Sequence, residues 1–219
     1  MTVVEDTDVV MATYAWPSNA ELIAACARLG YLKGQLRTLD ATYGKGTFWK
    51  QWRPDALVTN DIDPESDSDW HADFRVLPFA AGWFDAVVLD PPYKLNGTPT
   101  EAVDRRYGVD VVASRRDRMQ LIRDGITECA RVLGGGYLLL KCQDQVNGGK
   151  VRWQTIDFTE HAERCGLGLV DRLDILSYRP QPEGRRQVHA RRGSSSLLVF
   201  KRGWSWRDDV APSVIGAAS

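Results

Sequence analysis

The sequence predicts an α/β protein built around a mostly parallel sheet. Three apolar, strand-like runs end on aspartates, at Asp40, Asp61 and Asp90. Segments with apolar residues at helical spacing flank this region, and strands in turn with helices are typical of α/β folds. Ligands of open α/β sheets bind beyond the carboxyl ends of the strands. The three aspartates are therefore candidates for a ligand site.

Capping and turn signals set the boundaries of the elements. Ser18 and Glu21 fit a capping box, so a helix is predicted to begin there and to end at Gly30. The run Gly134-Gly135-Gly136 is predicted to stop a second, amphipathic helix. The predicted helices span residues 19–29, 119–133 and 158–165, and the predicted strands span 36–40, 56–61, 87–90, 137–141, 167–176 and 195–201. The last two strands, joined by a long basic loop, suggest an antiparallel hairpin at the sheet's edge.

Composition indicates one domain without a membrane span. The 219 residues are 43% hydrophobic and 26% charged, which suits a single globular unit. No apolar run approaches the roughly eighteen residues of a membrane helix, and the start Met1–Asp6 lacks a basic signal-peptide region. We therefore expect a cytoplasmic protein with no membrane partner.

The cysteines and the net charge argue against two further classes of protein. The four cysteines form no Cys-x-x-Cys pair, which disfavours a zinc site or a disulfide framework and favours reduced thiols. The formal net charge of −1 lacks the strong basic excess of many nucleic-acid-binding domains. Any nucleic-acid contact must therefore come from local clusters of charge.

The most informative motif is Asp90-Pro91-Pro92-Tyr93, which directly follows an apolar run. An exocyclic amino group of a nucleobase is a poor nucleophile, because its lone pair is delocalised into the ring. The Asp90 carboxylate and a carbonyl oxygen of the proline turn can accept both N–H hydrogens and localise that lone pair. The prolines fix the turn without adding an N–H, and the ring of Tyr93 can stack on an extruded base. The simpler interpretation is a rigid turn that ends a strand.

A second pattern, upstream, predicts a nucleoside cradle. Gly44 and Gly46 form a Gly-x-Gly turn after the run that ends at Asp40, and glycines let a backbone approach a ligand closely. Asp61 follows about twenty residues later, the offset at which an acid meets ribose hydroxyls. Asp73 could accept a hydrogen bond from an adenine amino group. The alternative for Asp61 is a solvated acid in a turn.

In order and spacing, these motifs resemble those of class I methyltransferases, which use S-adenosylmethionine (S-adenosyl-L-methionine). Within that class, the chain resembles the DPPY-containing amino-methyltransferase family, which methylates adenine N6 or cytosine N4 in DNA. The resemblance implies a three-layer, Rossmann-like fold, with a mostly parallel seven-stranded sheet and an antiparallel edge hairpin. It also implies a single methyltransferase domain over residues 13–202. Residues 1–12 show no periodicity and are expected to be flexible, and residues 203–219, with their small-residue ending, are expected to form a C-terminal tail.

The same resemblance implies roles for individual residues. Asp90, Pro91, Pro92 and Tyr93 form the expected catalytic turn, and direct methyl transfer there needs no metal. The residues implied in cofactor binding are Asp40, Ala41, Gly44, Gly46, Asp61, Asp73 and Phe74, together with Trp16, which is placed to close over the methionine end of the cofactor.

Basic side chains gather in two loop-like segments. Of the 21 arginines, ten lie within residues 105–118 and 179–192, and the planar guanidinium suits phosphate. The candidate nucleic-acid contacts are Arg105, Arg106, Arg115, Arg116, Lys150, Arg152, Arg185, Arg186, His189, Arg191 and Arg192. The polar segment 142–153 adds groups that could meet a base edge or stack on a base, namely Gln143, Gln145, Asn147 and Trp153. The alternative is solvated loops whose arginines have no ligand.

The favoured function is methyl transfer from S-adenosylmethionine to an exocyclic amino group of a nucleobase, with adenine N6 in DNA as the expected target. One alternative is an RNA methyltransferase that acts on guanine N2 or adenine N6. Another is a catalytically inactive module that binds the cofactor or a nucleic acid. A nicotinamide-binding Rossmann protein is disfavoured, because the third glycine of its fingerprint is missing. We expect DNA as partner, with RNA left open, and a monomer or weak homodimer.

Overall fold

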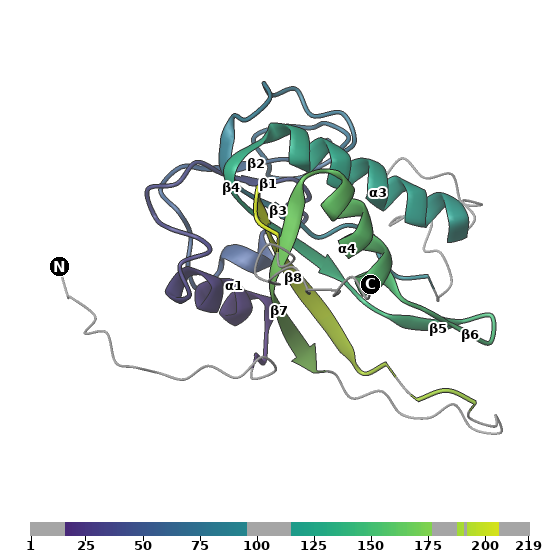
Figure 1. The fold of residues 1–219 in the computed structure, drawn as a ribbon. Coiled ribbons are helices and arrows are strands. Elements are labelled where there is room, and N and C mark those ends of the chain that lie inside the picture. The colour runs from purple at the N-terminus through teal and green to yellow at the C-terminus, as the bar shows by residue number, and fades with distance from the viewer. Residues whose placement is uncertain (1–15, 96–114, 177–187, 191, 206–219) are drawn as a thin grey trace, which may run out of the picture.

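The computed structural model describes residues 16–95, 115–176, 188–190 and 192–205. Its main sheet has six strands in the order β2-β1-β3-β4-β8-β7 (Figure 1). The strands are β1 (Thr38–Asp40), β2 (Leu57–Thr59), β3 (Phe84–Leu89), β4 (Leu133–Cys142), β7 (Leu167–Leu176) and β8 (Ser194–Arg202). Strands β1 to β4 run parallel, and β8 runs antiparallel to both β4 and β7. The predicted mostly parallel sheet and its antiparallel hairpin, β7 with β8, are therefore confirmed.

The prediction of seven strands is wrong for the described part of the chain, whose main sheet has six. Beyond β2, Trp70 forms only a single parallel bridge with Asn60. The Asp69 carboxylate accepts hydrogen bonds from the main-chain N–H of Thr59 and from its hydroxyl, both at 2.8 Å. The Asp69 side chain thus occupies the main-chain N–H of Thr59, which a further strand beside β2 would need for pairing. This limits the pairing beyond β2 to the one bridge between Asn60 and Trp70.

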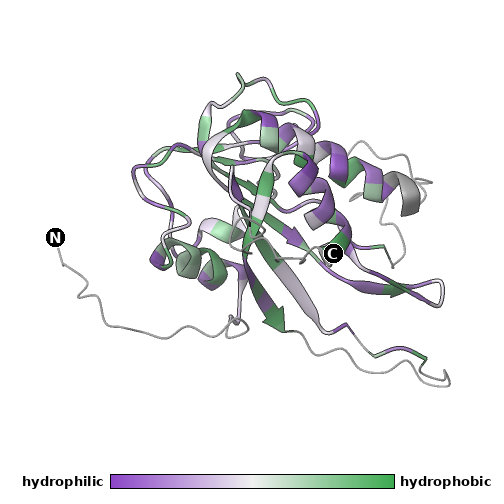
Figure 2. Ribbon diagram, viewed as in Figure 1, coloured by the Kyte–Doolittle hydropathy of each residue, from purple (hydrophilic) through white to green (hydrophobic). Residues whose placement is uncertain are grey.

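Helices cover both faces of the sheet and give the expected three layers (Figure 1). One face carries α1 (Asn19–Arg28) and the short 3-10 helix η1 (Thr47–Trp49), and the other carries α3 (Arg115–Val132) and α4 (Gln154–Arg164). Each layer packs its own buried core against the sheet. Figure 2 shows hydrophilic and hydrophobic residues in turn along α3 and α4, as expected for helices with one buried face.

The first helix agrees closely with its prediction. The Ser18 hydroxyl accepts a hydrogen bond from the main-chain N–H of Glu21 at 3.3 Å, which caps α1. The second helix differs at both ends: α3 already begins at Arg115, inside a segment predicted as a loop, and β4 follows it directly at Leu133.

The three glycines after α3 belong to a strand, contrary to the prediction that they only stop a helix. A Cβ on Gly136 would lie 1.7 Å from the carbonyl oxygen of Asp85, and one on Gly134 would lie 3.2 Å from that of Phe84. These glycines therefore let β4 pass very close to the main chain of β3, which a side chain at either position would prevent.

A small hairpin that was not predicted as strands lies between β4 and α4. Its strands are β5 (Gln145–Asn147) and β6 (Lys150–Arg152), which pair antiparallel. The two-residue turn is Gly148-Gly149, with φ of 60° and 72°, as a tight hairpin turn of type I′ requires. Figure 1 shows this hairpin projecting beyond the sheet.

Three further predictions concern the ends of the chain, the thiols and the membrane. The proposed tail at 203–219 is described only to residue 205, and its first residue, Gly203, donates a main-chain hydrogen bond to Gly166 at 3.1 Å; the N-terminal segment 1–12 lies outside the described residues. All four cysteines are free thiols, at Cys26, Cys129, Cys142 and Cys165. Within the described residues, no helix has the length and apolarity to cross a membrane.

Candidate active site

Asp40, at the end of β1, is almost fully enclosed by protein. Its carboxylate accepts hydrogen bonds from the Thr42 main-chain N–H at 3.0 Å and from the Trp49 indole at 2.7 Å. Burial raises the pKa of Asp40 to about 7 against the effect of these two bonds, and the nearby Asp90 and Asp61 add to the rise. Asp40 thus couples the end of β1 to η1 and adds an acid to the carboxyl edge of the sheet.

Asp61 and its neighbour Asn60 brace the glycine turn. The Asp61 carboxylate accepts the main-chain N–H of Gly44 at 2.7 Å and that of Asp63 at 2.9 Å. The Asn60 amide donates to the carbonyl oxygens of Ala41 and Ala72 at 3.0 Å and 2.9 Å. The two residues after β2 therefore fix the path of the chain beyond β1, and Asp61 does so from a buried position.

The two glycines of the turn serve different purposes. Both have positive φ, 57° at Gly44 and 62° at Gly46. A Cβ on Gly46 would lie 2.5 Å from the hydroxyl oxygen of Tyr43, whereas a Cβ on Gly44 would meet nothing within 4 Å. Gly46 is thus required by packing, while Gly44 presents open backbone, as a cradle for a ligand needs.

Asp90, directly after β3, differs from the other two acids. Its main-chain N–H donates to the Thr42 hydroxyl at 2.8 Å, which ties it to the end of β1. Among the described residues, none donates a hydrogen bond to the Asp90 carboxylate. Burial raises the pKa of Asp90 to about 6, while the positive charges of Lys141 and Lys94 oppose the rise. Its carboxylate can therefore accept from a ligand.

Lys141, near the end of β4, is a site residue that the sequence analysis missed. It is 1% exposed, and its ammonium donates to the Asn19 side-chain oxygen in α1 at 2.6 Å. Burial lowers the pKa of Lys141, and the negative charge of Asp90 opposes this. The apolar strand around Lys141 predicts only a core position. A lysine within such a strand could still have indicated a site residue, because lysine is rarely buried without a polar partner.

The proline turn brings a carbonyl oxygen to the same edge as Asp90. The main-chain N–H of Tyr93 donates to the carbonyl oxygen of Pro91 at 2.7 Å, which closes a tight turn. A carbonyl oxygen has two lone pairs, so this bond leaves one acceptor site at Pro91. The ring of Tyr93 is half-buried against the core on the α3 face.

A cleft of about 270 Å³ opens where the ends of β1 and β3 meet. Its lining combines the segment after β1 with the acid that precedes the proline turn: Asp40, Thr42, Tyr43, Gly44, Lys45, Thr47, Phe48 and Asp90. Two acids and exposed glycine backbone in one cleft suit a ligand with hydroxyl groups and positive charge. No group of three potential metal ligands occurs in the described part of the chain.

Three other candidate cofactor residues have structural partners. Asp73 forms an ion pair with Arg75 at 2.5 Å, and the hydrogen bonds and charge of Arg75 lower the pKa of Asp73 more than burial raises it. Phe74 is buried and would collide with a Cβ on Gly125 of α3, so its ring packs in the core. Trp16 is buried beside α1 and η1, and its indole N–H has no hydrogen-bond partner among the described residues.

The candidate nucleic-acid contacts separate into two groups. Arg105, Arg106, Arg185, Arg186 and Arg191 lie outside the described residues, as do the side chains of Arg115 and Arg116. The others gather at the β5–β6 hairpin. Lys150 and Arg152 are on β6, His189 contacts the carbonyl oxygen of Gly149 at 2.8 Å, and the Arg192 guanidinium lies 4.4 Å from the centre of the Trp153 ring.

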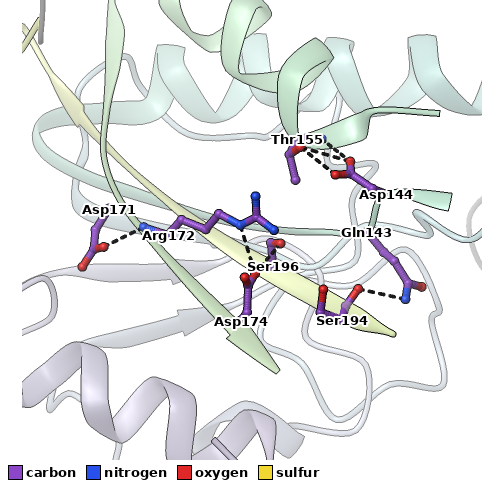
Figure 3. Close-up of polar contacts among 8 residues, drawn as sticks. All are labelled: Gln143, Asp144, Thr155, Asp171, Arg172, Asp174, Ser194 and Ser196. Carbon is purple, nitrogen blue, oxygen red and sulfur yellow. Dashed lines mark hydrogen bonds and ion pairs between the residues drawn. The ribbon is translucent and has the colours of Figure 1, made fainter. Parts of the chain in front are cut away.

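The glutamines and asparagine expected to meet a base edge are used inside the protein. Gln143 donates to the carbonyl oxygen of Ser194 at 3.0 Å, as Figure 3 shows. Gln145 donates to the carbonyl oxygen of Tyr93 at 2.8 Å, and Asn147 to that of Leu95 at 2.8 Å. These three residues are buried. The expectation that these three residues contact a base is therefore replaced by a structural role for their side-chain amides.

Comparisons with known proteins agree on the fold. No protein-family model matches the chain, and no curated protein matches its sequence. Among solved structures, it is similar to a proposed methyltransferase from Bacillus halodurans, with 15% identity, a TM-score of 0.53, and coverage of 82% of this chain and 98% of that one. It is also similar to a proposed sarcosine dimethylglycine methyltransferase from Galdieria sulphuraria, with 13% identity, a TM-score of 0.52, and coverage of 85% and 86%.

A third similar structure is a proposed DNA modification methylase from Thermus thermophilus, with 17% identity and a TM-score of 0.42. That match covers 65% of this chain, and the chain spans 56% of the Thermus protein. At these identities, the likenesses establish the fold alone. The chain has the α/β fold of methyltransferases.

Proposed function

We propose that this protein transfers a methyl group from S-adenosylmethionine to an exocyclic amino group of a nucleobase, with adenine N6 in DNA as the favoured target. The observation that carries the proposal is the carboxylate of Asp90, which directly follows β3, precedes the proline turn and accepts no hydrogen bond from any described residue. A turn that served only to end a strand would not need a partly buried acid that lines a cleft and has no hydrogen-bond donor among the described residues.

The residues of the turn supply two acceptors for one amino group. The Asp90 carboxylate accepts one N–H hydrogen, and the remaining lone pair of the Pro91 carbonyl oxygen accepts the other. This orients the nitrogen and localises its lone pair, so the work of the protein is alignment and the exclusion of water. Tyr93 stacks on the extruded base, which enzymes that act on bases must take out of the stack.

The cradle fits the proposed cofactor in charge and shape. S-adenosylmethionine supplies a methyl group on a positively charged sulfonium, which is a good leaving group. Asp40 and Asp90 line the same cleft and favour a cationic ligand there, while Gly44 gives room for close approach of its nucleoside. Asp61 contributes by fixing Gly44, and each of its oxygens keeps a lone pair for a ribose hydroxyl.

The β5–β6 hairpin supports a nucleic-acid substrate. Lys150, Arg152, Arg192 and the half-exposed ring of Trp153 combine positive charge with an aromatic face, a pairing that suits phosphate and bases.

The test is transfer of tritium from labelled S-adenosylmethionine to unmethylated genomic DNA and, separately, to total RNA, followed by chromatography of the nucleosides. Asp90→Ala is the inactive variant. Asp124→Ala, which removes an exposed acid on α3, is its matched control and should remain active. We expect label in N6-methyladenine from DNA with the wild type and the control, and none with Asp90→Ala.

Two results contradict parts of the proposal. Label in RNA alone would keep the mechanism and replace the substrate. Cofactor binding without any transfer, unchanged by Asp90→Ala, would leave a binding module in place of an enzyme.

A further inference from the structure

Three buried side-chain amides lie between the β5–β6 hairpin and the catalytic turn. They belong to Gln145 and Asn147 of β5 and Gln154 at the start of α4, which are 7%, 9% and 0% exposed. We name these three residues the amide clamp. Buried amides are costly unless their donors and acceptors are used, so their partners show what the clamp holds.

The clamp holds the main chain that follows the catalytic turn. The Tyr93 carbonyl oxygen accepts two hydrogen bonds, from Gln145 at 2.8 Å and from Gln154 at 2.7 Å. The Leu95 main-chain N–H donates to the side-chain oxygen of Gln145 at 2.9 Å, and the Leu95 carbonyl oxygen accepts from Asn147 at 2.8 Å. The main chain on the exit side of Tyr93 is therefore fixed by side chains of the hairpin and α4.

The clamp is itself anchored to the sheet. The main-chain N–H of Gln143 donates to the Gln154 side-chain oxygen at 3.1 Å, and the Gln145 amide also donates to the Gln143 carbonyl oxygen at 3.2 Å. Next to it, Asp144 accepts hydrogen bonds from the main chain and hydroxyl of Thr155, as Figure 3 shows. The end of β4, the hairpin, the start of α4 and the catalytic turn thus form one connected unit.

The partner strand of the same hairpin carries the basic surface, because Arg152 pairs with Gln145 and Lys150 pairs with Asn147. Only the Gly148-Gly149 turn separates Asn147 of the clamp from Lys150 on β6. Next to the hairpin, the Arg192 guanidinium lies over the Trp153 ring. A two-stranded hairpin of three-residue strands is marginally stable by itself and depends on its contacts with the rest of the protein, so a ligand that binds the basic surface would add to the contacts that order it.

We propose that the amide clamp couples polyanion binding at the β5–β6 hairpin to the position of Tyr93 in the catalytic turn. Gln145, Asn147 and Gln154 are then positioning residues: they touch no reacting atom, and they act through Tyr93 and Leu95. A nucleic acid bound at Lys150 and Arg152 orders the hairpin, and the clamp passes this order to the turn that must hold the target base. The nucleic-acid ligand in this inference rests on the proposed function.

The experiment measures hydrogen exchange of the Leu95 amide by NMR, with and without a mixed-sequence DNA duplex. In the wild type, we expect the duplex to slow this exchange. Gln145→Met removes the acceptor of the Leu95 N–H, so exchange should become about fivefold faster, the effect of one lost hydrogen bond. The duplex should no longer slow it, although it binds with affinity within about twofold of wild type because the basic residues are intact.

Three further variants make the test specific. Asn147→Ala removes a single hydrogen bond to Leu95 and serves where Gln145→Met does not fold; it too should lose the effect of DNA. Gln120→Met, which changes an exposed glutamine on α3, is the matched control and should retain it. The pair Lys150→Ala and Arg152→Ala leaves the clamp intact, and should weaken duplex binding and its dependence on salt.

The inference is overturned if bound duplex leaves Leu95 exchange unchanged in the wild type, or slows it equally in Gln145→Met and Asn147→Ala. Absence of duplex binding overturns it as well. A failure of the proposed function looks different: the duplex would still slow Leu95 exchange through the clamp, but no methyl group would be transferred to DNA or RNA.

Discussion

The two turns at the carboxyl edge of the sheet are held in opposite ways. Beyond β1, carboxylates accept main-chain N–H groups: Asp40 holds Thr42 and Asp61 holds Gly44. Beyond β3, side-chain amides hold the main chain after Tyr93, and no described residue donates to the carboxylate of Asp90. The acids beyond β1 use their oxygens to fix a loop, whereas the Asp90 carboxylate has no donor among the described residues and is open to a ligand. The comparison therefore distinguishes the two turns without reference to any relative.

The largest effect that follows from this difference is on turnover. Asp90→Asn keeps the size of the side chain and one acceptor oxygen but loses the negative charge that polarises the amino group. We expect kcat to fall by about a thousandfold, within the range for a lost acid or base, while the affinity for S-adenosylmethionine and the unfolding temperature are retained. Methyl transfer and thermal unfolding, measured on the same preparation, provide the check. If the variant is fully active, Asp90 has only a structural role, and the difference between the two turns has no bearing on catalysis.

The opposite outcome is expected for Asp61→Ala. This variant leaves the main-chain N–H groups of Gly44 and Asp63 without their carboxylate partner. We expect the free energy of unfolding to fall by about 2–4 kcal/mol. Urea denaturation measures the change. Asp67→Ala, which removes an exposed acid six residues later, is the control and should stay within about 0.5 kcal/mol of wild type. Equal losses in both variants would show that Asp61 does not brace the cradle.

The two glycines of the cradle should respond differently to alanine. At Gly46 the new Cβ meets Tyr43 and the φ is positive, so we expect a loss of stability of about 1–3 kcal/mol. At Gly44 the Cβ meets open space, and only the cost of the left-handed backbone, about 1 kcal/mol, is expected. Calorimetric titration with S-adenosylmethionine should show the larger loss of affinity for Gly44→Ala, because Gly44 lines the cleft. A larger loss of affinity for Gly46→Ala than for Gly44→Ala would contradict the proposed contact between Gly44 and the cofactor.

The smallest effect concerns pH. Asp90 must be ionised to accept a hydrogen, and its pKa is raised to about 6, so kcat/KM should rise with pH up to about 6 and level off above it. Removal of the positive charge in Lys141→Met should raise this pKa further and move the midpoint to higher pH. Lys94→Met should move it less, because Lys94 is exposed and screened by solvent. Initial rates between pH 5 and 8 supply the profiles, and identical midpoints in all three proteins would rule out Lys141 as an electrostatic partner of Asp90.

The order of elements was predictable from the sequence because apolar period and capping are local signals. Ser18 caps α1 as expected, and the strand that ends at Asp40 and the strand that Asp90 follows lie where the apolar runs place them. The run that includes Gly134 and Gly136 predicts the end of a helix, because glycines give the same local signal in a turn and in a close approach of two strands. Only the contact with β3 distinguishes these cases.

The site was predictable where a residue type is unusual and less so where partners decide its role. Asp90 and Gly44 stand in a motif, and both line the cleft. Gln145 looks in sequence like a polar loop residue that could meet a base, and its role at the Tyr93 carbonyl depends on a contact across 52 positions. The same holds for Asp73, whose partner Arg75 competes for its carboxylate with any ligand.

The reversed direction of β8 has a consequence for how such a protein can change over evolution. Because β7 and β8 are antiparallel neighbours, Leu176 and Ser194, which pair in register, both lie at the edge where the ligand-facing ends of the parallel strands meet. The connection between them can be lengthened or exchanged without any shift in the strands that carry Asp40 and Asp90. Each doubling of its length costs only about 0.6 kcal/mol in loop closure. Natural variation and laboratory grafting therefore have a low-cost position at which to change the surface beside this edge and leave the residues of the cleft as they are.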